Sequence, residues 1–218
     1  MATPAPKKFV SRAGGKLEHA LDAFTFDVTD LECADFGCNV GGFTDCLLQR
    51  GAASVVAIDT GHNVLAWKLR ADPRVTVKER TNALHTPPPP PSEAVDLVVL
   101  DMAWTRLQLA IPAALRWLRP APASANAARP HILTLVKPHY ELEPAEKDEL
   151  LVEGRLDHEV AETVSQRTLD ALAERLCVRI RGHIRSPMTG GKSSKKHGKG
   201  NVEFLALLEP AEPDSATA

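Results

Sequence analysis

Short apolar runs alternate with stretches of helical periodicity along most of the chain, and this alternation sets the fold class. Apolar runs of strand length lie at 31–36, 54–58, 75–79, 95–100, 131–136, 177–184 and 201–208. Apolar residues recur at the spacing of amphipathic helices at 11–24, 43–50, 62–70, 107–118 and 157–176. Strands that alternate with helices predict a mainly parallel sheet with helices on both faces. The sequence therefore predicts an α/β protein with a Rossmann-like architecture.

The two ends of the chain differ in composition from this alternating region. Residues 1–9 are rich in Pro, Ala and Lys, and residues 209–218 are acidic and rich in Pro and Ala. Segments of this kind bury too little apolar surface to fold. We therefore expect one domain at 10–208, between a disordered N-terminus and a disordered acidic tail. The proline run at 87–91 is interpreted as a stiff spacer, with a proline-motif ligand as the alternative.

Charge and cysteine content favour a soluble cytoplasmic protein. The formal net charge is −2, which gives no strong overall attraction to nucleic acid. The four cysteines show neither CxxC nor Cys/His ligand spacing, so we expect reduced thiols and no metal. No apolar run reaches the length of a membrane span, and Lys7 and Lys8 precede no signal-peptide core. We therefore expect no membrane partner.

A glycine-rich turn, Gly37 to Gly42, follows the first predicted strand, and the second strand ends in Asp59. Glycines let a backbone approach a ligand closely, and a carboxylate at that offset can accept hydrogen bonds from ribose hydroxyls. The spacing is G-x-x-x-G-G, and no Lys or Arg lies between Asp35 and Gln49 to offset a pyrophosphate. Both features favour S-adenosylmethionine over a dinucleotide, with a plain tight turn as the alternative.

The predicted cofactor site collects residues from several strand ends. Asn82, just after the third strand, is placed where an adenine edge can be read, although a plain polar turn explains it equally well. The predicted set is Gly37, Cys38, Asn39, Gly41, Gly42, Phe43, Asp59, Asn82 and Asp101.

Four further polar residues stand at structural boundaries. Asp101 and Lys137 end apolar strands, Glu203 begins or interrupts the last strand, and Lys16 lies in the first amphipathic stretch. Strand ends of an open α/β sheet are where such folds place their sites. Two lysines beside two carboxylates suit the activation of a weakly acidic hydroxyl. Each residue alone also has a structural explanation, such as a helix N-cap for Asp101.

Several segments in order resemble the FtsJ-like family of S-adenosylmethionine-dependent RNA ribose 2′-O-methyltransferases, and within it the haemolysin/TlyA-type rRNA methyltransferases. They are 10–17, 41–49, 65–70, 79–82, 135–138 and 200–204. The resemblance implies a Rossmann-like methyltransferase fold, with a mainly parallel seven-stranded sheet and an antiparallel last strand. It also implies a catalytic tetrad, which maps onto Lys16, Asp101, Lys137 and Glu203. Lys137 would be the base, Asp101 and Glu203 would orient it, and Lys16 would supply positive charge.

A basic segment supports an RNA substrate, with rRNA or a ribosomal particle as the expected partner. Between Arg185 and Lys199 the chain has no acidic residue, and Gly and Ser separate its cations. A flexible cationic loop can bind phosphates without reading sequence, although a solvated surface loop is the alternative. The predicted RNA-binding residues are Arg185, Lys192, Lys195, Lys196 and Lys199.

Two departures from the family pattern keep other functions open. We expect no S4 domain, because only about ten residues precede the Ser11-Arg12 motif, and Asp101-Met-Ala-Trp104 replaces the family's Asp-Val-Ser-Phe. One alternative is a methyltransferase for another substrate or a nucleotide-cofactor oxidoreductase. The other is an RNA-binding protein that keeps the fold without turnover.

Overall fold

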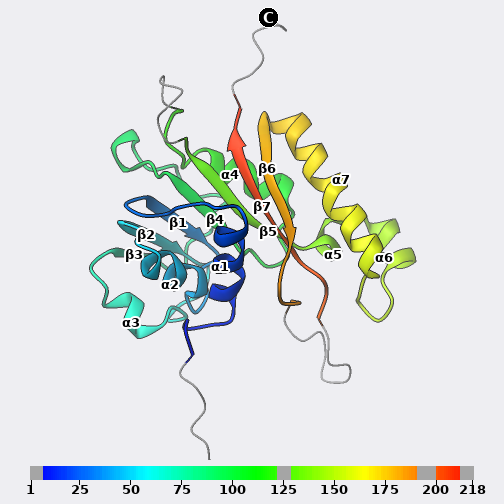
Figure 1. Ribbon diagram of the computed structural model, residues 1–218, viewed down its shortest axis with the longest axis horizontal. Coiled ribbons are helices and arrows are strands. Elements are labelled where there is room, and N and C mark those ends of the chain that lie inside the picture. Colours follow the sequence, from blue (N-terminus) through cyan, green and yellow to red (C-terminus); the bar gives the residue numbers. More distant parts are fainter. Residues whose placement is uncertain (1–6, 122–128, 191–199, 212–218) are drawn as a thin grey trace, which may run out of the picture.

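A mixed sheet forms the centre of the computed structural model, which describes residues 7–121, 129–190 and 200–211. The sheet has seven strands within those residues, in the order β3-β2-β1-β4-β5-β7-β6 (Figure 1). Neighbours from β3 to β5 pair in parallel, and β7 is antiparallel to both β5 and β6. This confirms the predicted topology. The strands are β1 (Glu32–Phe36), β2 (Ser54–Ile58), β3 (Val75–Lys78), β4 (Leu97–Leu100), β5 (His131–Val136), β6 (Val178–Arg185) and β7 (Phe204–Pro210).

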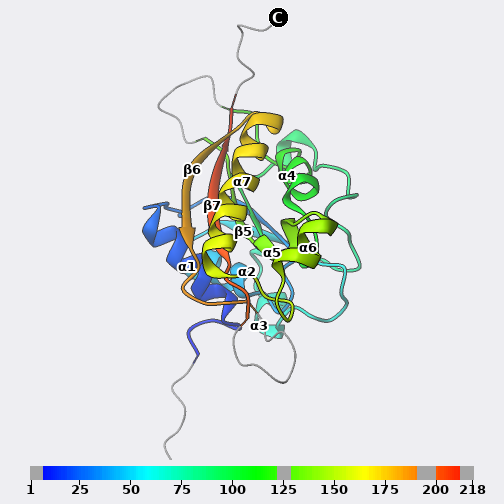
Figure 2. The same cartoon turned by 90° about the vertical axis from the view of Figure 1, so that its right-hand side faces the viewer.

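Helices cover both faces of the sheet, as Figure 2 shows with the sheet seen close to edge-on. The helices are α1 (Ala13–Ala23), α2 (Gly42–Gln49), α3 (Trp67–Arg70), α4 (Leu107–Leu115), α5 (Pro138–Glu141), α6 (Pro144–Leu150) and α7 (His158–Leu176). A 3₁₀ turn, η1 (Pro91–Glu93), ends the proline run. Among the described residues, no helix has both the length and the apolar character needed to cross a membrane.

Alternate residues of the central strands enter two separate hydrophobic cores. Ala34 and Phe36 of β1 pack in one core with α4 and α7, whereas Cys33 packs in the other with α1 and α2. β4 divides in the same way, because Val98 and Leu100 face the first core and Leu97 and Val99 the second. A strand buried on both faces favours apolar residues at successive positions, which is why β4 is a continuous apolar run.

The strand register brings the ends of five strands to one edge of the sheet. Phe36 pairs with Ile58 and Leu100, and Val136 pairs with Phe204. Gly37, Asp59, Asp101 and Lys137 therefore directly follow β1, β2, β4 and β5, while Glu203 directly precedes β7. Residues far apart in the sequence thus meet at the edge where α/β sheets place their sites.

The predicted helix at 62–70 is wrong for most of its length, because only Trp67–Arg70 is helical. Gly61 donates its amide to the Asp59 side chain, and Ala66 donates its amide to Val40 O at 3.0 Å. These hydrogen bonds hold residues 61–66 in a turn that follows β2, so they do not form a helix. The helices α5 and α6 were not predicted, although each begins with a proline in its first turn, a position that suits the fixed φ of proline.

Residues 7–9 and 209–211, which lie outside the predicted 10–208 domain, belong to the described structure. Phe9 is buried, and its ring packs on Gly14 of α1. Glu209 and Pro210 belong to β7, and the buried Glu209 carboxylate forms ion pairs with Arg129, Arg179 and Arg181. The buried ring of Phe9 holds the first of these segments against α1. The ion pairs of Glu209 with three arginines hold the second in the sheet.

Candidate active site

Two adjoining cavities lie at the edge where the strand ends meet. The larger measures about 380 Å³, and its lining includes Gly37, Asp59, Asp101 and Trp104. The smaller measures about 180 Å³ and includes Asp35, Phe43 and Lys137 in its wall. Gly37, Asn39, Asp101 and Ala103 line both cavities. Their arrangement suits one elongated ligand that spans both cavities.

The glycine turn allows the backbone to form the floor of these cavities. Gly37 has a φ of 81°, and a Cβ there would lie 2.9 Å from the Asp101 carbonyl oxygen. Gly41 has a φ of 98° and packs on Leu65 and Leu69, so it shapes the turn but lies outside the lining of both cavities. Of the other predicted turn residues, Asn39 lines both cavities, and Cys38, Gly42 and Phe43 line the smaller one.

Asp35 is a candidate site residue that the sequence analysis did not single out. Its Oδ2 atom accepts hydrogen bonds from the amide of Thr44 at 3.0 Å and from its hydroxyl at 2.7 Å. Its Oδ1 atom is buried and has no hydrogen-bond partner among the described residues, although Asp35 lines the smaller cavity. Burial raises the pKa of this carboxyl to about 7, Thr44 opposes the rise, and Asp101 and Asp59 add to it. The available signal was an acidic residue at the next-to-last position of a buried strand that leads into a glycine turn.

Asp59 lies in the larger cavity with both carboxylate oxygens already engaged by the backbone. Asn39 donates its amide to Oδ2 at 2.9 Å, and Gly61 donates its amide to Oδ1 at 2.7 Å. Each carboxylate oxygen can accept more than one hydrogen bond. The two amides therefore orient Asp59 and leave it able to accept from ligand hydroxyls.

Asn82 also lines the larger cavity, but its side chain serves a local turn. The Oδ1 atom accepts the Leu84 amide at 3.0 Å, and the Asn82 carbonyl accepts the amides of His85 and Thr86. The polar turn anticipated as an alternative is thus present. It is compatible with contact to a ligand, because the turn itself forms part of the cavity wall.

Asp101 and Lys137 form an ion pair at the junction of the two cavities. The Lys137 Nζ atom lies 2.6 Å from Asp101 Oδ1 and donates a second bond to Met102 O at 3.1 Å. Both side chains keep some exposure, 13% for Lys137 and 23% for Asp101. Asp101 is not a helix N-cap, because Arg106 occupies that position of α4.

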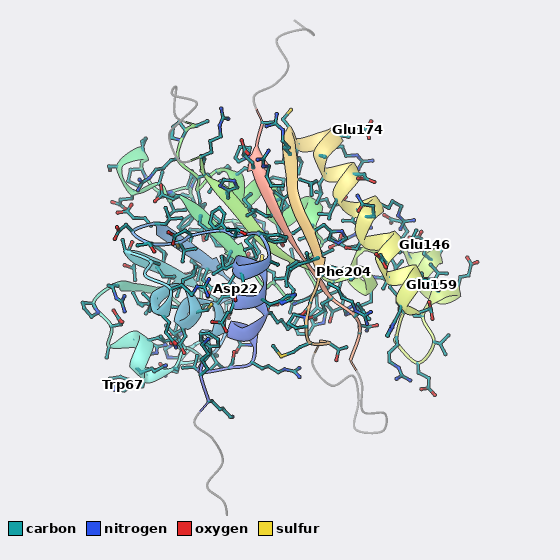
Figure 3. All side chains as sticks on the ribbon, viewed as in Figure 1. Asp22, Trp67, Glu146, Glu159, Glu174 and Phe204 are labelled. Carbon is teal, nitrogen blue, oxygen red and sulfur yellow. The ribbon has the colours of Figure 1, made fainter. Side chains whose placement is uncertain are left out.

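Lys16 and Glu203 form a second ion pair, which is buried. The Lys16 ammonium donates to Glu203 Oε2, and both side chains are under 10% exposed, at 7% and 4%. Phe204, the next residue, marks the start of β7 in Figure 3, and α1 packs against this strand. Neither Lys16 nor Glu203 lines the two cavities. The predicted tetrad therefore consists of a partly exposed pair at the cavities and a buried pair that joins α1 to the residue before β7.

The predicted RNA-binding residues fall mostly outside the described part of the chain. Arg185 ends β6 and is exposed, with its guanidinium 3.4 Å from His158 Nδ1. Lys192, Lys195, Lys196 and Lys199 lie outside the described residues.

A larger hollow, of about 730 Å³, lies along the exposed side of α7 and includes none of the strand-end residues. Only residues of α7 line this hollow, and it contains no glycine turn. We therefore take the strand-end cavities as the candidate active site. Within 7–121, 129–190 and 200–211, no group of three or more His, Cys, Asp or Glu side chains has metal-binding geometry.

The sheet order, the two-sided helix cover and the strand-end cavities define a Rossmann-like methyltransferase fold. The model of the FtsJ-like methyltransferase family matches residues 9–197, and the chain belongs to this family.

Individual relatives agree with this assignment. TlyA of Mycobacterium tuberculosis, named a 16S/23S rRNA (cytidine-2′-O)-methyltransferase, is 44% identical over 142 residues, which is 65% of this chain and 50% of TlyA. Hemolysin A of Brachyspira hyodysenteriae is 32% identical over 202 residues, covering 91% of this chain and 76% of the relative. The solved structure of a hemolysin-named protein from Streptococcus thermophilus superposes with a TM-score of 0.81 at 32% identity, covering 99% of this chain and 73% of that one.

Proposed function

We propose that this protein transfers a methyl group from S-adenosylmethionine to a ribose 2′-hydroxyl of RNA, with rRNA as the substrate. The observation that carries the proposal is the Asp101–Lys137 ion pair at the junction of two cavities beside a glycine turn. A lysine in that position can take a proton from a hydroxyl placed next to a bound cofactor.

The cavity residues fit the chemistry of S-adenosylmethionine. The buried Oδ1 atom of Asp35 would accept from its ammonium group. The amides of Gly42 and Phe43, which lie in the first turn of α2 where a helix supplies no internal acceptor, would bind its carboxylate. Asp59 would accept from its ribose hydroxyls, and the turn at Asn82 would contact its adenine. When bound, this cofactor supplies an electrophilic methyl group.

The geometry of Lys137 suits a general base in its neutral form. A neutral amine has two N–H bonds and one lone pair. Asp101 Oδ1 and Met102 O accept the two N–H bonds, which leaves the lone pair to take the proton of the 2′-hydroxyl. A correctly placed base contributes about 10²–10⁴-fold to such a reaction. The buried Lys16–Glu203 pair would act by holding α1 and β7 in place.

The substrate proposal draws on the relatives and on the basic segment. TlyA is named an rRNA 2′-O-methyltransferase, but this chain spans only half its length, so its substrates do not transfer automatically. Arg185 and the lysines at 192, 195, 196 and 199 would hold the RNA backbone. We place this reaction in the cytoplasm, as the cysteine content suggests.

Incubation with radiolabelled S-adenosylmethionine and unmodified rRNA tests the proposal. We expect label in the RNA, and after digestion with a nuclease that needs a free 2′-hydroxyl, the label should stay in resistant dinucleotides. Label in mononucleotides would indicate base methylation and contradict the proposed atom. Cofactor binding without transfer would instead support the non-catalytic RNA-binding alternative, and label in proteins or small molecules would support another substrate.

A further inference from the structure

The segment between β4 and α4, residues Asp101 to Arg106, carries one member of the catalytic pair and has no regular secondary structure. It lines the larger cavity, and its Trp104 has a φ of 56°, an uncommon value for a bulky side chain. At its start, the Asp101 amide donates to Phe36 O, and Lys137 binds Asp101 and Met102. A segment without regular secondary structure can hold the Asp101 carboxylate in one position only if its far end, near Arg106, is also fixed by contacts.

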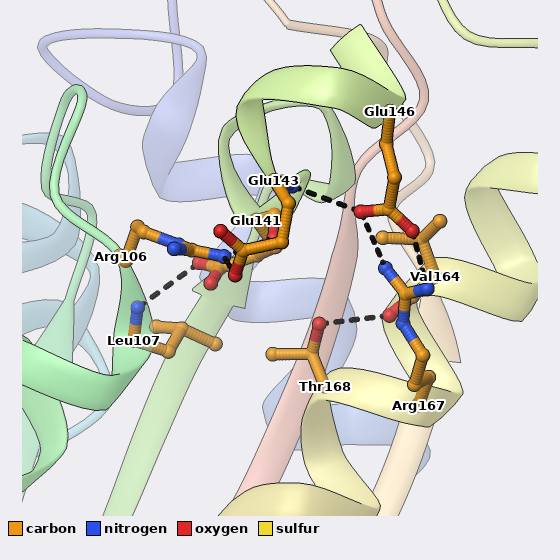
Figure 4. A network of polar contacts seen from close by, with 8 residues as sticks. All are labelled: Arg106, Leu107, Glu141, Glu143, Glu146, Val164, Arg167 and Thr168. Carbon is orange, nitrogen blue, oxygen red and sulfur yellow. Dashed lines mark hydrogen bonds and ion pairs between the residues drawn. The ribbon is translucent and has the colours of Figure 1, made fainter. Parts of the chain in front are cut away.

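That anchor comes from the segment that follows Lys137. Glu141, the last residue of α5, accepts the Leu107 amide on Oε1 at 3.0 Å. Arg106 donates from Nη2 to the Glu141 carbonyl at 2.7 Å and to Glu143 Oε1 at 2.6 Å (Figure 4). The segments that follow β4 and β5 are therefore linked twice. Asp101 pairs with Lys137 at the cavity, and Glu141 binds both Arg106 and Leu107 at the start of α4.

Glu141 supplies what α4 lacks. This helix has no side-chain N-cap of its own and no acidic residue in its first turn. The Glu141 carboxylate satisfies one of its unpaired amides and places negative charge at its N-terminus. Glu141 is buried, and burial raises the pKa of its carboxyl, with the Leu107 amide and Arg106 opposing the rise.

Little space separates the two links. Met102, Thr105, Lys137 and Glu141 share the wall of a void of only about 10 Å³, a size at which a single water molecule barely fits. A displacement of Glu141 or of the α4 N-terminus would therefore reach Met102 and Lys137 directly, because a packed interior transmits shifts.

We propose that Glu141, together with Arg106, is a positioning residue that fixes the Asp101–Arg106 segment against Lys137 and so sets the geometry of the base. Glu141 touches neither cavity that would hold cofactor and hydroxyl. The inference rests on the proposed function of Lys137.

Three variants test it by methyl transfer to rRNA. Glu141→Ala removes the acceptor for Leu107, and kcat should fall by roughly 10²-fold, the effect of an error of about 1 Å in positioning. The dissociation constant for S-adenosylmethionine should stay near the wild-type value, because Asp35, Asp59 and α2 would hold it. Glu141→Gln keeps an oxygen acceptor and should restore most of the rate. Glu143→Ala is the matched control, since it removes the other Arg106 partner but is 63% exposed, and kcat should not change.

The pH dependence of kcat separates positioning from a purely structural role. In Glu141→Ala this profile should differ from that of the wild type, because the 2.6 Å contact between Lys137 Nζ and Asp101 Oδ1 is no longer held in place. A variant that only loses stability would keep the wild-type profile and the wild-type kcat per cofactor-binding site, and that outcome overturns the inference. An unchanged rate in Glu141→Ala overturns it as well.

A folding failure of Glu141→Ala leaves the test to Arg106→Gln, which removes the donor to the Glu141 carbonyl but keeps the Leu107–Glu141 bond. Reduced kcat with unchanged cofactor affinity supports the inference, and wild-type kcat overturns it. A wild-type chain that transfers no methyl group to RNA would contradict the proposed function instead, so the two failures are distinguishable.

Discussion

Lys137 and Asp101 directly follow two neighbouring parallel strands, β5 and β4, and their side-chain atoms Nζ and Oδ1 are 2.6 Å apart at the edge where the two cavities meet. A second pair, Lys16–Glu203, is buried and joins the first helix to the residue that precedes the last strand. The division into a partly exposed and a buried pair leads to different expectations for the two pairs.

Lys137→Ala should abolish methyl transfer and leave S-adenosylmethionine binding nearly intact, because the lost group acts on the hydroxyl rather than on the cofactor. Transfer of a tritiated methyl group and calorimetric titration with the cofactor measure the two effects. Lys147→Ala, which changes an exposed lysine of α6, is the control. Near wild-type transfer in Lys137→Ala would refute the role of the base.

Asp59→Ala should weaken S-adenosylmethionine binding by about 1.5–3 kcal/mol, the usual contribution of hydrogen bonds to a charged group. Asp72→Ala is a matched control, because Asp72 also accepts the amide two residues on, from Arg74, but lies outside both cavities. Calorimetric titration of both variants checks the assignment. Equal affinity in Asp59→Ala and wild type would remove Asp59 from the cofactor site.

Gly190→Ala should disturb the buried ion pair of the tetrad. A Cβ at residue 190 would lie 2.6 Å from Glu203 Oε1, which must then move relative to Lys16. We expect a loss of about 1–3 kcal/mol in the free energy of unfolding, typical of overpacking, together with reduced turnover. Thermal unfolding and methyl transfer measure the two.

Gly15→Ala is the control for this variant. A Cβ there meets only the flexible end of Met188, at 3.0 Å. This variant should be neutral or more stable, since alanine is the better helix former. A Gly190→Ala protein with wild-type stability and rate would show that Glu203 has room to adjust.

Asp35 should make the free energy of unfolding depend on pH. Its carboxyl has a pKa of about 7 in the folded chain against 3.8 as the reference value, so the folded state binds the proton over that interval and the unfolded state does not. The free energy of unfolding should therefore fall as pH rises from about 4 to about 7, by at most on the order of 4 kcal/mol. Chemical denaturation of Asp35→Asn at several pH values should show a shallower fall. Identical pH dependence in the two proteins would exclude Asp35 as the cause.

Replacing Lys192, Lys195, Lys196 and Lys199 with alanine should weaken RNA binding and flatten its salt dependence. The slope of log affinity against log salt concentration should become less steep by up to about 3, because each of four contacts with a single-stranded backbone contributes about 0.7. A variant with equal charge change, at the exposed Lys7, Lys8, Lys78 and Lys147, is the control. If both variants keep the wild-type slope, the RNA is held elsewhere on the surface.

The sequence by itself determined the alternation of strands and helices, and with it the parallel sheet. Strands buried on both faces favour apolar residues, and β2 and β4 follow that preference almost throughout, whereas β1 and β5 each bury one polar residue, Asp35 and Thr134. The same local logic marked the glycine turn and the charged residues at strand ends. In the segment from Gly61 to Ala66, the helical periodicity was misleading. Hydrogen bonds from Gly61 to the Asp59 side chain and from Ala66 to Val40 O hold this segment in a non-helical conformation.

Only the tertiary structure decided which of these residues act together. The pairing of β4 with β5 brought Asp101 to Lys137, the packing of α1 against β7 brought Lys16 to Glu203, and no spacing along the chain encodes those distances. The unpartnered Oδ1 atom of Asp35 and the cap that Glu141 provides for α4 likewise arise from contacts between distant segments. Sequence periodicity indicates which side of its own helix or strand a residue occupies. A site depends instead on how helices and strands pack against one another, and burial and strand pairing set that arrangement.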